Sequence, residues 1–115
     1  MNDFSLIFRN EQNPDVQFSP DQMQGILKQW RDWIGGIAAQ NKLSNHGNRL
    51  GFEAAVVRGN NVVTDGPYAE IKEMITGFII VKAETLQEAI ELSKGCPIFN
   101  AGGSVEVRNI IPTEM

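Results

Sequence analysis

The stretch GFIIVK, residues 77–82, decides the fold, because it carries apolar side chains on both faces of a predicted β-strand. A strand of this kind is covered on two sides, so it lies in the centre of a sheet. The segment FSLIFR, residues 4–9, has the same character, with Ile7 on the face opposite its other apolar residues. The sequence therefore predicts two central strands.

A long helix is predicted between these two strands. Ser19 is its N-cap, Pro20 takes the first helical position and Gln22 completes a capping box. Gly35 and Gly36 interrupt the helical pattern, so either another backbone approaches closely there or the helix breaks locally. The apolar stripe that indicates the buried face consists of Met23, Ile26, Leu27, Trp30, Ile34 and Ile37, with Trp33 at its side.

A second helix follows the central strand 77–82. Thr85 is its predicted N-cap and Glu88 completes another capping box, while Gly95 and Pro97 end the helix. Its inner face is predicted to contain Leu86, Ala89, Ile90 and Ser93.

The remaining segments supply a loop, a hairpin and a last strand. Residues 41–50 are polar and predict a loop that serves as a lid or rim. Residues 52–58 and 61–64 predict a hairpin across a two-residue turn at 59–60. Residues 104–110 alternate in polarity and predict a half-exposed edge strand.

This order of elements predicts one α+β domain, residues 1–115, built as a split βαβ sandwich with an added hairpin strand. Two helices cover only one face of such a sheet. The other face has apolar residues too, including Ile7, one set from 78–81 and part of 105–111. A second copy packing sheet on sheet is the simplest cover, so we expect a homodimer.

The composition excludes several classes of partner. The chain of 115 residues has a net charge of −4, and its Lys and Arg residues are scattered singly. These features argue against nucleic acid and against an anionic membrane surface. No apolar run approaches the length of a membrane span. Cys96 is the only cysteine, which fits a reducing cytoplasm, and we expect it to be a packed residue rather than a reactive thiol.

The candidate site is the stretch TDGPYAEIKE, residues 64–73. Turn chemistry explains its opening Asp-Gly-Pro but not the charges that follow. Asp65, Glu70 and Glu73 are three carboxylates close in sequence. A carboxylate crowded by others in a cleft has a raised pKa and accepts protons near neutral pH. We therefore take these three as the catalytic candidates.

The substrate-binding candidates surround these carboxylates. Lys72 would orient an anionic substrate or stabilise a developing oxyanion. Arg49 and His46 would close over the cleft from the preceding loop, and Tyr68 lies within the stretch itself. Together they indicate a cofactor-independent lyase or isomerase that performs acid–base chemistry on a small polar organic molecule.

A structural explanation of the same stretch stays open. Asp65 would then only cap its turn, while Glu70 and Glu73 would pair with Lys72 or Arg58 at the surface for about 0–1 kcal/mol. The protein would in that case be a non-catalytic ligand-binding or regulatory module.

Motifs for bound cofactors are absent from the sequence. We find no Gly-rich phosphate loop, no paired Cys-x-x-Cys and no Gly-x-Ser-x-Gly elbow. His46 is the only histidine, so a solvated side chain is favoured over a metal ligand. We expect neither a cofactor nor a metal.

The run VTDGPYAEIKE at 63–73, followed by Gly77 and Phe78, resembles the YCII-related family in the branch named for its Asp-Gly-Pro-Phe motif. Tyr68 stands where that branch usually has Phe. Further family-like features extend the resemblance over nearly the whole chain: Ser19-Pro20 with the long helix, residues 94–97 and residues 103–108.

The resemblance implies a ferredoxin-like α+β fold that dimerises through its sheets, as in a dimeric α/β-barrel type of assembly. A few relatives are small enzymes, including a dehydrochlorinase that acts on a chlorinated hydroxyquinol, and some members are joined to sigma factors. Enzyme-like members are thought to use a histidine and an aspartate in a cleft. Residues 23–40 contain no histidine, so the resemblance carries over Asp65 alone.

Overall fold

The computed structural model describes residues 1–11, 17–51, 53–65 and 73–113. Four of its strands form one antiparallel sheet in the order β2-β5-β1-β6, and β3 pairs with β4 in a separate sheet. The elements in chain order are β1 (Asn2–Glu11), α1 (Pro20–Ala39), β2 (Leu43–Arg49), β3 (Ala55–Arg58), β4 (Val62–Asp65), β5 (Glu73–Ala83), α2 (Leu86–Ser93), the 3₁₀ helix η1 (Pro97–Ala101) and β6 (Ser104–Asn109).

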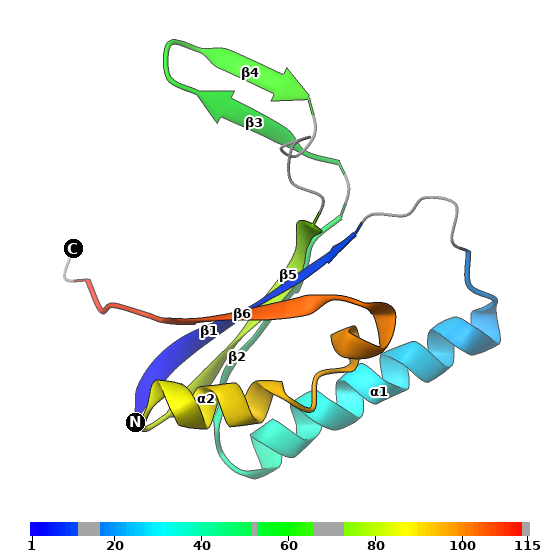
Figure 1. The fold of residues 1–115 in the computed structure, drawn as a ribbon, viewed down its shortest axis with the longest axis vertical. Coiled ribbons are helices and arrows are strands. Elements are labelled where there is room, and N and C mark those ends of the chain that lie inside the picture. The colour runs from blue at the N-terminus through cyan, green and yellow to red at the C-terminus, as the bar shows by residue number, and fades with distance from the viewer. Residues whose placement is uncertain (12–16, 52, 66–72, 114–115) are drawn as a thin grey trace.

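The sheet order confirms the predicted α+β architecture. Strands β1 and β5 occupy the centre and β6 lies at an edge, as expected for a split βαβ sandwich. Both helices lie on the same side of this sheet (Figure 1). Leu6 pairs with Ile79 across the two central strands, and both side chains are fully buried beneath the helices.

Helix α1 begins as predicted. The backbone N–H of Gln22 donates to Ser19 Oγ over 3.1 Å, and the N–H of Ser19 donates back to Gln22 Oε1 over 2.9 Å. In the predicted stripe Ile37 is buried, while Trp30, Trp33 and Ile34 pack against the core. Leu27, in contrast, is 43% exposed.

Gly35 and Gly36 fit neither of the two explanations that the sequence left open. The helix runs unbroken from Pro20 to Ala39. No described atom lies within 4 Å of the position that a Cβ would take at either glycine. Both glycines are exposed, so this stretch of α1 meets no described backbone.

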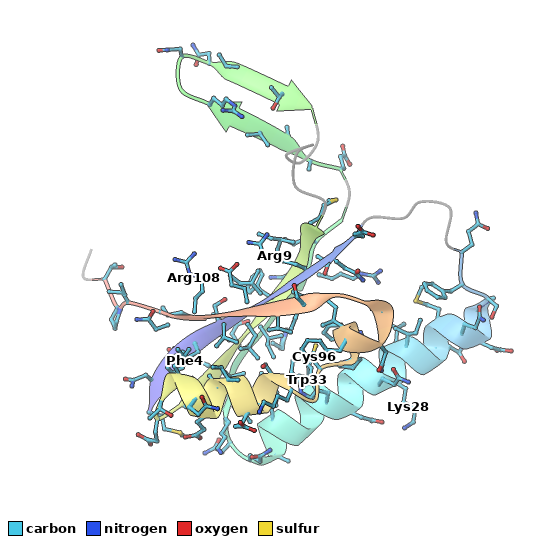
Figure 2. The ribbon with its side chains drawn as sticks, in the orientation of Figure 1. Phe4, Arg9, Lys28, Trp33, Cys96 and Arg108 are labelled. Atoms are coloured by element: carbon cyan, nitrogen blue, oxygen red, sulfur yellow. The ribbon has the colours of Figure 1, made fainter. Side chains whose placement is uncertain are left out.

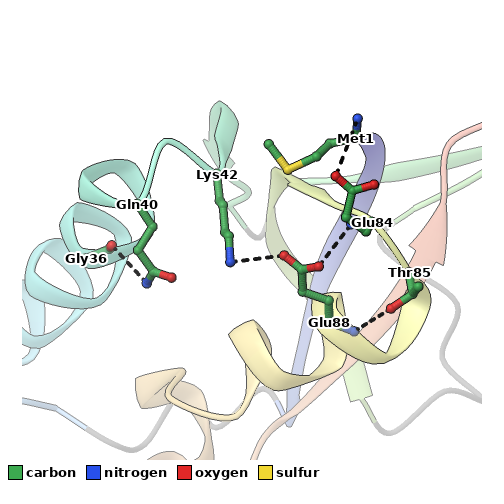
Figure 3. Close-up of polar contacts among 7 residues, drawn as sticks. All are labelled: Met1, Gly36, Gln40, Lys42, Glu84, Thr85 and Glu88. Atoms are coloured by element: carbon green, nitrogen blue, oxygen red, sulfur yellow. Dashed lines mark hydrogen bonds and ion pairs between the residues drawn. The ribbon is translucent and has the colours of Figure 1, made fainter.

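Helix α2 begins at Thr85, whose Oγ1 accepts a hydrogen bond from the N–H of Glu88 over 3.1 Å. The Glu88 carboxylate departs from the predicted capping box, since it accepts from the N–H of Glu84 instead and pairs with Lys42 Nζ over 3.0 Å (Figure 3). The hydrogen bond from Lys42 is the largest cause of a lowered Glu88 pKa. Leu86 was predicted on the inner face and is 49% exposed, because it lies in the first turn of the helix.

Residues 41–50 were predicted as a loop, and the prediction was wrong. Most of this segment is the edge strand β2, which pairs with β5 through two register shifts. Gly47 permits this pairing, because its φ of 61° places the backbone so close to β5 that a Cβ would overlap the Phe78 carbonyl oxygen. The polar side chains of β2 are compatible with a strand because it lies at an edge, where they reach solvent.

The predicted hairpin exists, but it does not add a strand to the main sheet. β3 and β4 form their own sheet, which projects away from the helices and the main sheet (Figure 1). Three residues connect β3 to β4, and not the predicted two, because Arg58 pairs with Val62. Two of these three, Asn60 and Asn61, have positive φ. β2 takes the place in the main sheet that the hairpin strand was expected to fill.

Cys96 packs in the core, as the sequence analysis favoured. Burial raises the pKa of its thiol to about 11. The thiol therefore stays protonated near neutral pH, and a thiolate nucleophile is not available there.

Candidate functional site

The structure describes only part of the candidate site. Asp65 is the last residue of β4, and its backbone pairs with Ala55. Glu73 is the first residue of β5, and its backbone pairs with Glu11 at the end of β1. The other candidates within the acidic stretch lie outside the described residues, namely Tyr68, Glu70 and Lys72.

Arg49 lies at the same end of the main sheet as Glu73. Its backbone pairs with Gly77, and the N–H of Leu50 donates to the Thr76 carbonyl over 2.9 Å. The chain leaves the sheet just after this point, forms the β3–β4 hairpin and returns at Glu73 (Figure 1). The fold therefore places the backbones of Arg49 and Glu73 on neighbouring strands at one sheet end.

His46 is exposed on the edge strand β2 and not on a lid. Together with Leu43, Ser44 and Asn45 it lines an open depression. The strand bends here, because Asn45 Oδ1 accepts a hydrogen bond of 2.7 Å from the N–H of Gly47. All described residues that line this depression come from β2.

Within residues 1–11, 17–51, 53–65 and 73–113, no three His, Cys, Asp or Glu side chains gather in a way that could hold a metal ion. No helix among the same residues is long and apolar enough to cross a membrane.

A cluster of three charged side chains was missed by the sequence analysis. Arg9 on β1 donates from Nε to Glu106 Oε1 on β6 over 3.2 Å, and its Nη2 lies 3.2 Å from the same oxygen. The Nη1 atom of Arg108 lies 3.6 Å from Glu106 Oε2. We call these residues the Arg9–Glu106–Arg108 cluster.

The cluster lies on the face of the main sheet that the helices leave open. Arg9 and Arg108 extend from the sheet away from α1 and α2 (Figure 2). The Arg9 side chain is only 27% exposed, whereas that of Arg108 is 69% exposed. The sequence lacks the signal that would reveal this cluster, which is the strand register. Glu106 pairs with Ile7 across β1 and β6, and this pairing brings Glu106 close to Arg9.

The chain is similar to a known protein family and to a curated protein. A model of the family described as "YCII-related domain" matches residues 7–114. An uncharacterised protein of Rhizobium meliloti (strain 1021) is 39% identical over 51 residues, which are 44% of this chain. The aligned part covers 41% of the length of that relative.

Proposed function

Because the chain belongs to the YCII-related domain family, we propose that it is a homodimer with cofactor-independent acid–base activity, of the lyase or isomerase type, on a small polar organic molecule. One observation carries this proposal. Arg49 ends β2 and Glu73 begins β5 at the same end of the sheet, and Asp65 ends β4 in the hairpin between them along the chain. The proposal is that these three residues act together on one substrate.

The proposed roles follow from the chemistry of each side chain. Asp65, Glu70 or Glu73 accepts a proton from the substrate, because a crowded carboxylate is a suitable general base near neutral pH. Lys72 stabilises the negative charge that develops when the proton leaves. The remaining binding candidates, Tyr68, Arg49 and His46, orient the substrate's polar groups.

The homodimer is supported by the open face of the main sheet. Ile7, Phe78 and Ile80 lie on this face and are half-buried within a single chain. An apolar sheet face without a helical cover is typical of an association surface. A second copy that presents the same face would bury both sets of side chains by a two-fold arrangement.

A non-catalytic binding or regulatory module remains the second candidate, and the β3–β4 hairpin favours it. Val57 and Val63 pair across the hairpin on one face and are 71% and 59% exposed. Exposed paired valines on a projecting hairpin suit contact with another protein. His46 and Arg49 are also exposed in the single chain, whereas a catalytic site excludes water.

The test is a thermal-shift screen of small hydroxylated aromatics and organic acids against the wild type, Asp65→Asn and Asp32→Asn. Asp32 is a matched control, since it is an exposed aspartate on α1 that pairs with Lys28. The proposal predicts that some compound raises the midpoint of the wild type and of Asp32→Asn but not of Asp65→Asn. If no compound raises the midpoint of the wild type, and Asp65→Asn lowers the midpoint by itself, the role of Asp65 is to stabilise its turn. The non-catalytic binding or regulatory module is then the favoured function.

A further inference from the structure

Among the residues that the structure describes, the Arg9–Glu106–Arg108 cluster has more hydrogen-bond donors than acceptors to receive them. Each guanidinium group carries five N–H donors, whereas the single carboxylate of Glu106 offers two oxygens. Both contacts of Arg9 go to Oε1, so the pair lacks the parallel two-oxygen geometry that saturates a guanidinium–carboxylate pair. The cluster therefore holds one net positive charge and unused donors on the open face, in a chain whose net charge is −4.

An apolar surface lies directly beside these charges. Ile7 pairs with Glu106 on one side and with Phe78 on the other, so the three side chains form one row across β6, β1 and β5. Side chains paired in this way lie about 5 Å apart at their Cβ atoms. Ile7 and Phe78 thus offer an apolar platform next to the guanidinium groups.

We propose that the Arg9–Glu106–Arg108 cluster binds a small organic carboxylate, with the carboxylate at the guanidinium groups and the apolar body over Ile7 and Phe78. Arginine suits this role because its planar fork matches the two oxygens of a carboxylate. In the proposed dimer the bound molecule would lie between the two sheets, over Ile7 and Phe78, and shielding from water there strengthens such hydrogen bonds. The proposal deepens the proposed function by naming the substrate class, and it rests on that function only for the turnover of the bound molecule.

Three other charged residues of β1 and β5 lie near this site, namely Asp3, Glu11 and Lys82. Lys82 and Asp3 lie opposite each other on β5 and β1 of the same face and balance each other in charge. Glu11 follows Arg9 by two residues on β1, about 7 Å along the strand, and is exposed to solvent that screens it. Glu106 is therefore the anion that competes most directly with an incoming carboxylate.

The experiment is titration calorimetry of the full chain with benzoate and with inorganic phosphate, at constant ionic strength set with chloride. The variants are Arg9→Gln, Arg108→Gln, Glu106→Gln and the control Lys28→Gln. Lys28 is an exposed cation on α1, so the control removes one positive charge away from the open face (Figure 2). Circular dichroism and the thermal midpoint of each variant verify that it is folded.

We expect benzoate to bind the wild type and Lys28→Gln alike, and Arg9→Gln to weaken its affinity by roughly tenfold or more. Arg108→Gln should weaken it less, because Arg108 is the more exposed of the two. Glu106→Gln should bind benzoate more tightly, since the competing carboxylate is gone, whereas a purely structural ion pair would give only lower stability. If Arg9→Gln fails to fold, the affinity of Glu106→Gln for benzoate still tests the proposal.

The contrary results are equally specific. No binding of benzoate to the wild type and to Glu106→Gln overturns the proposal, as does an affinity that Arg9→Gln leaves unchanged. Phosphate binding as tight as benzoate binding overturns the organic carboxylate, because phosphate has no apolar body to contact Ile7 and Phe78. Since no turnover is measured, these failures leave the Asp65 experiment and the acid–base proposal untouched.

Discussion

The two faces of the main sheet are built from the same strands but have different surroundings. On the covered face, Leu6 and Ile79 are fully buried beneath the helices. On the open face, Ile7 and Phe78 are half-buried and stand beside charged side chains. Successive strand residues point to opposite faces, so one short run of sequence serves both. The difference teaches that the covered face supplies the stability of a single chain, while the open face is available for association and binding.

The largest expected effect tests this division directly. Leu6→Ala should lower the free energy of unfolding by about 3 kcal/mol, because it removes a side chain with no exposed surface and leaves a cavity. Ile7→Ala, one residue along the same strand, should cost a single chain less. Urea unfolding at several protein concentrations measures both losses. The loss for Ile7→Ala should vary with concentration, as expected for a residue covered by a second copy; equal, concentration-independent losses would contradict the division.

A smaller loss of stability is expected from removing the hydrogen bond between α1 and α2 above the covered face. Trp33 Nε1 donates to the Leu92 carbonyl over 3.1 Å, and its ring makes an edge contact with Phe8 at a centroid distance of 5.9 Å. Trp33→Phe should cost about 1–2 kcal/mol, because it leaves that carbonyl without this donor. Gln40→Ala is the control, since it removes an exposed side-chain bond to the Gly36 carbonyl. A loss no larger than that of the control would contradict the role of Trp33.

The smallest effect is a dependence on pH at the start of α2. The hydrogen bond from Lys42 lowers the pKa of Glu88 from its ordinary value of 4.5. Ionised Glu88 therefore stabilises the fold above that value, and its contribution is lost as the pH falls through the lowered pKa. Glu88→Gln should have a lower thermal midpoint than the wild type at pH 7, and the two midpoints should converge in acid.

Lys42→Gln provides the check on this prediction, because it removes the first cause of the lowered Glu88 pKa. The pH-dependent part of the Glu88→Gln effect should become smaller in the Lys42→Gln background. A difference that persists unchanged at low pH would mean that packing, and not charge, explains the effect of Glu88→Gln.

The sequence predicted the elements whose signals are local. The central strands have apolar residues on both faces, and the capping residues Ser19 and Thr85 mark both helix starts. It missed β2, because LSNHGNR contains one large apolar residue and becomes a strand only through its pairing with β5. It likewise placed the hairpin in the main sheet, where β2 lies instead.

The candidate site was predictable to a lesser extent. The sequence pointed to Asp65, Glu73 and Arg49, but only the strand register shows that Arg49 and Glu73 share a sheet end. It gave no sign of the contact between Arg9 and Glu106, which are distant along the chain and meet across paired strands. Long-range contacts of this kind depend on register, which local patterns do not specify.

Light scattering of the wild type, Ile80→Glu and Val57→Glu tests the central claim most directly. Ile80 is half-buried on the open face of the main sheet, whereas Val57 is exposed on β3 of the separate β3–β4 sheet. At micromolar concentration we predict twice the chain mass of 12.8 kDa for the wild type and for Val57→Glu, and the single-chain mass for Ile80→Glu. A wild type with the single-chain mass, or an Ile80→Glu variant that stays dimeric, would contradict the claim that the open face joins two copies.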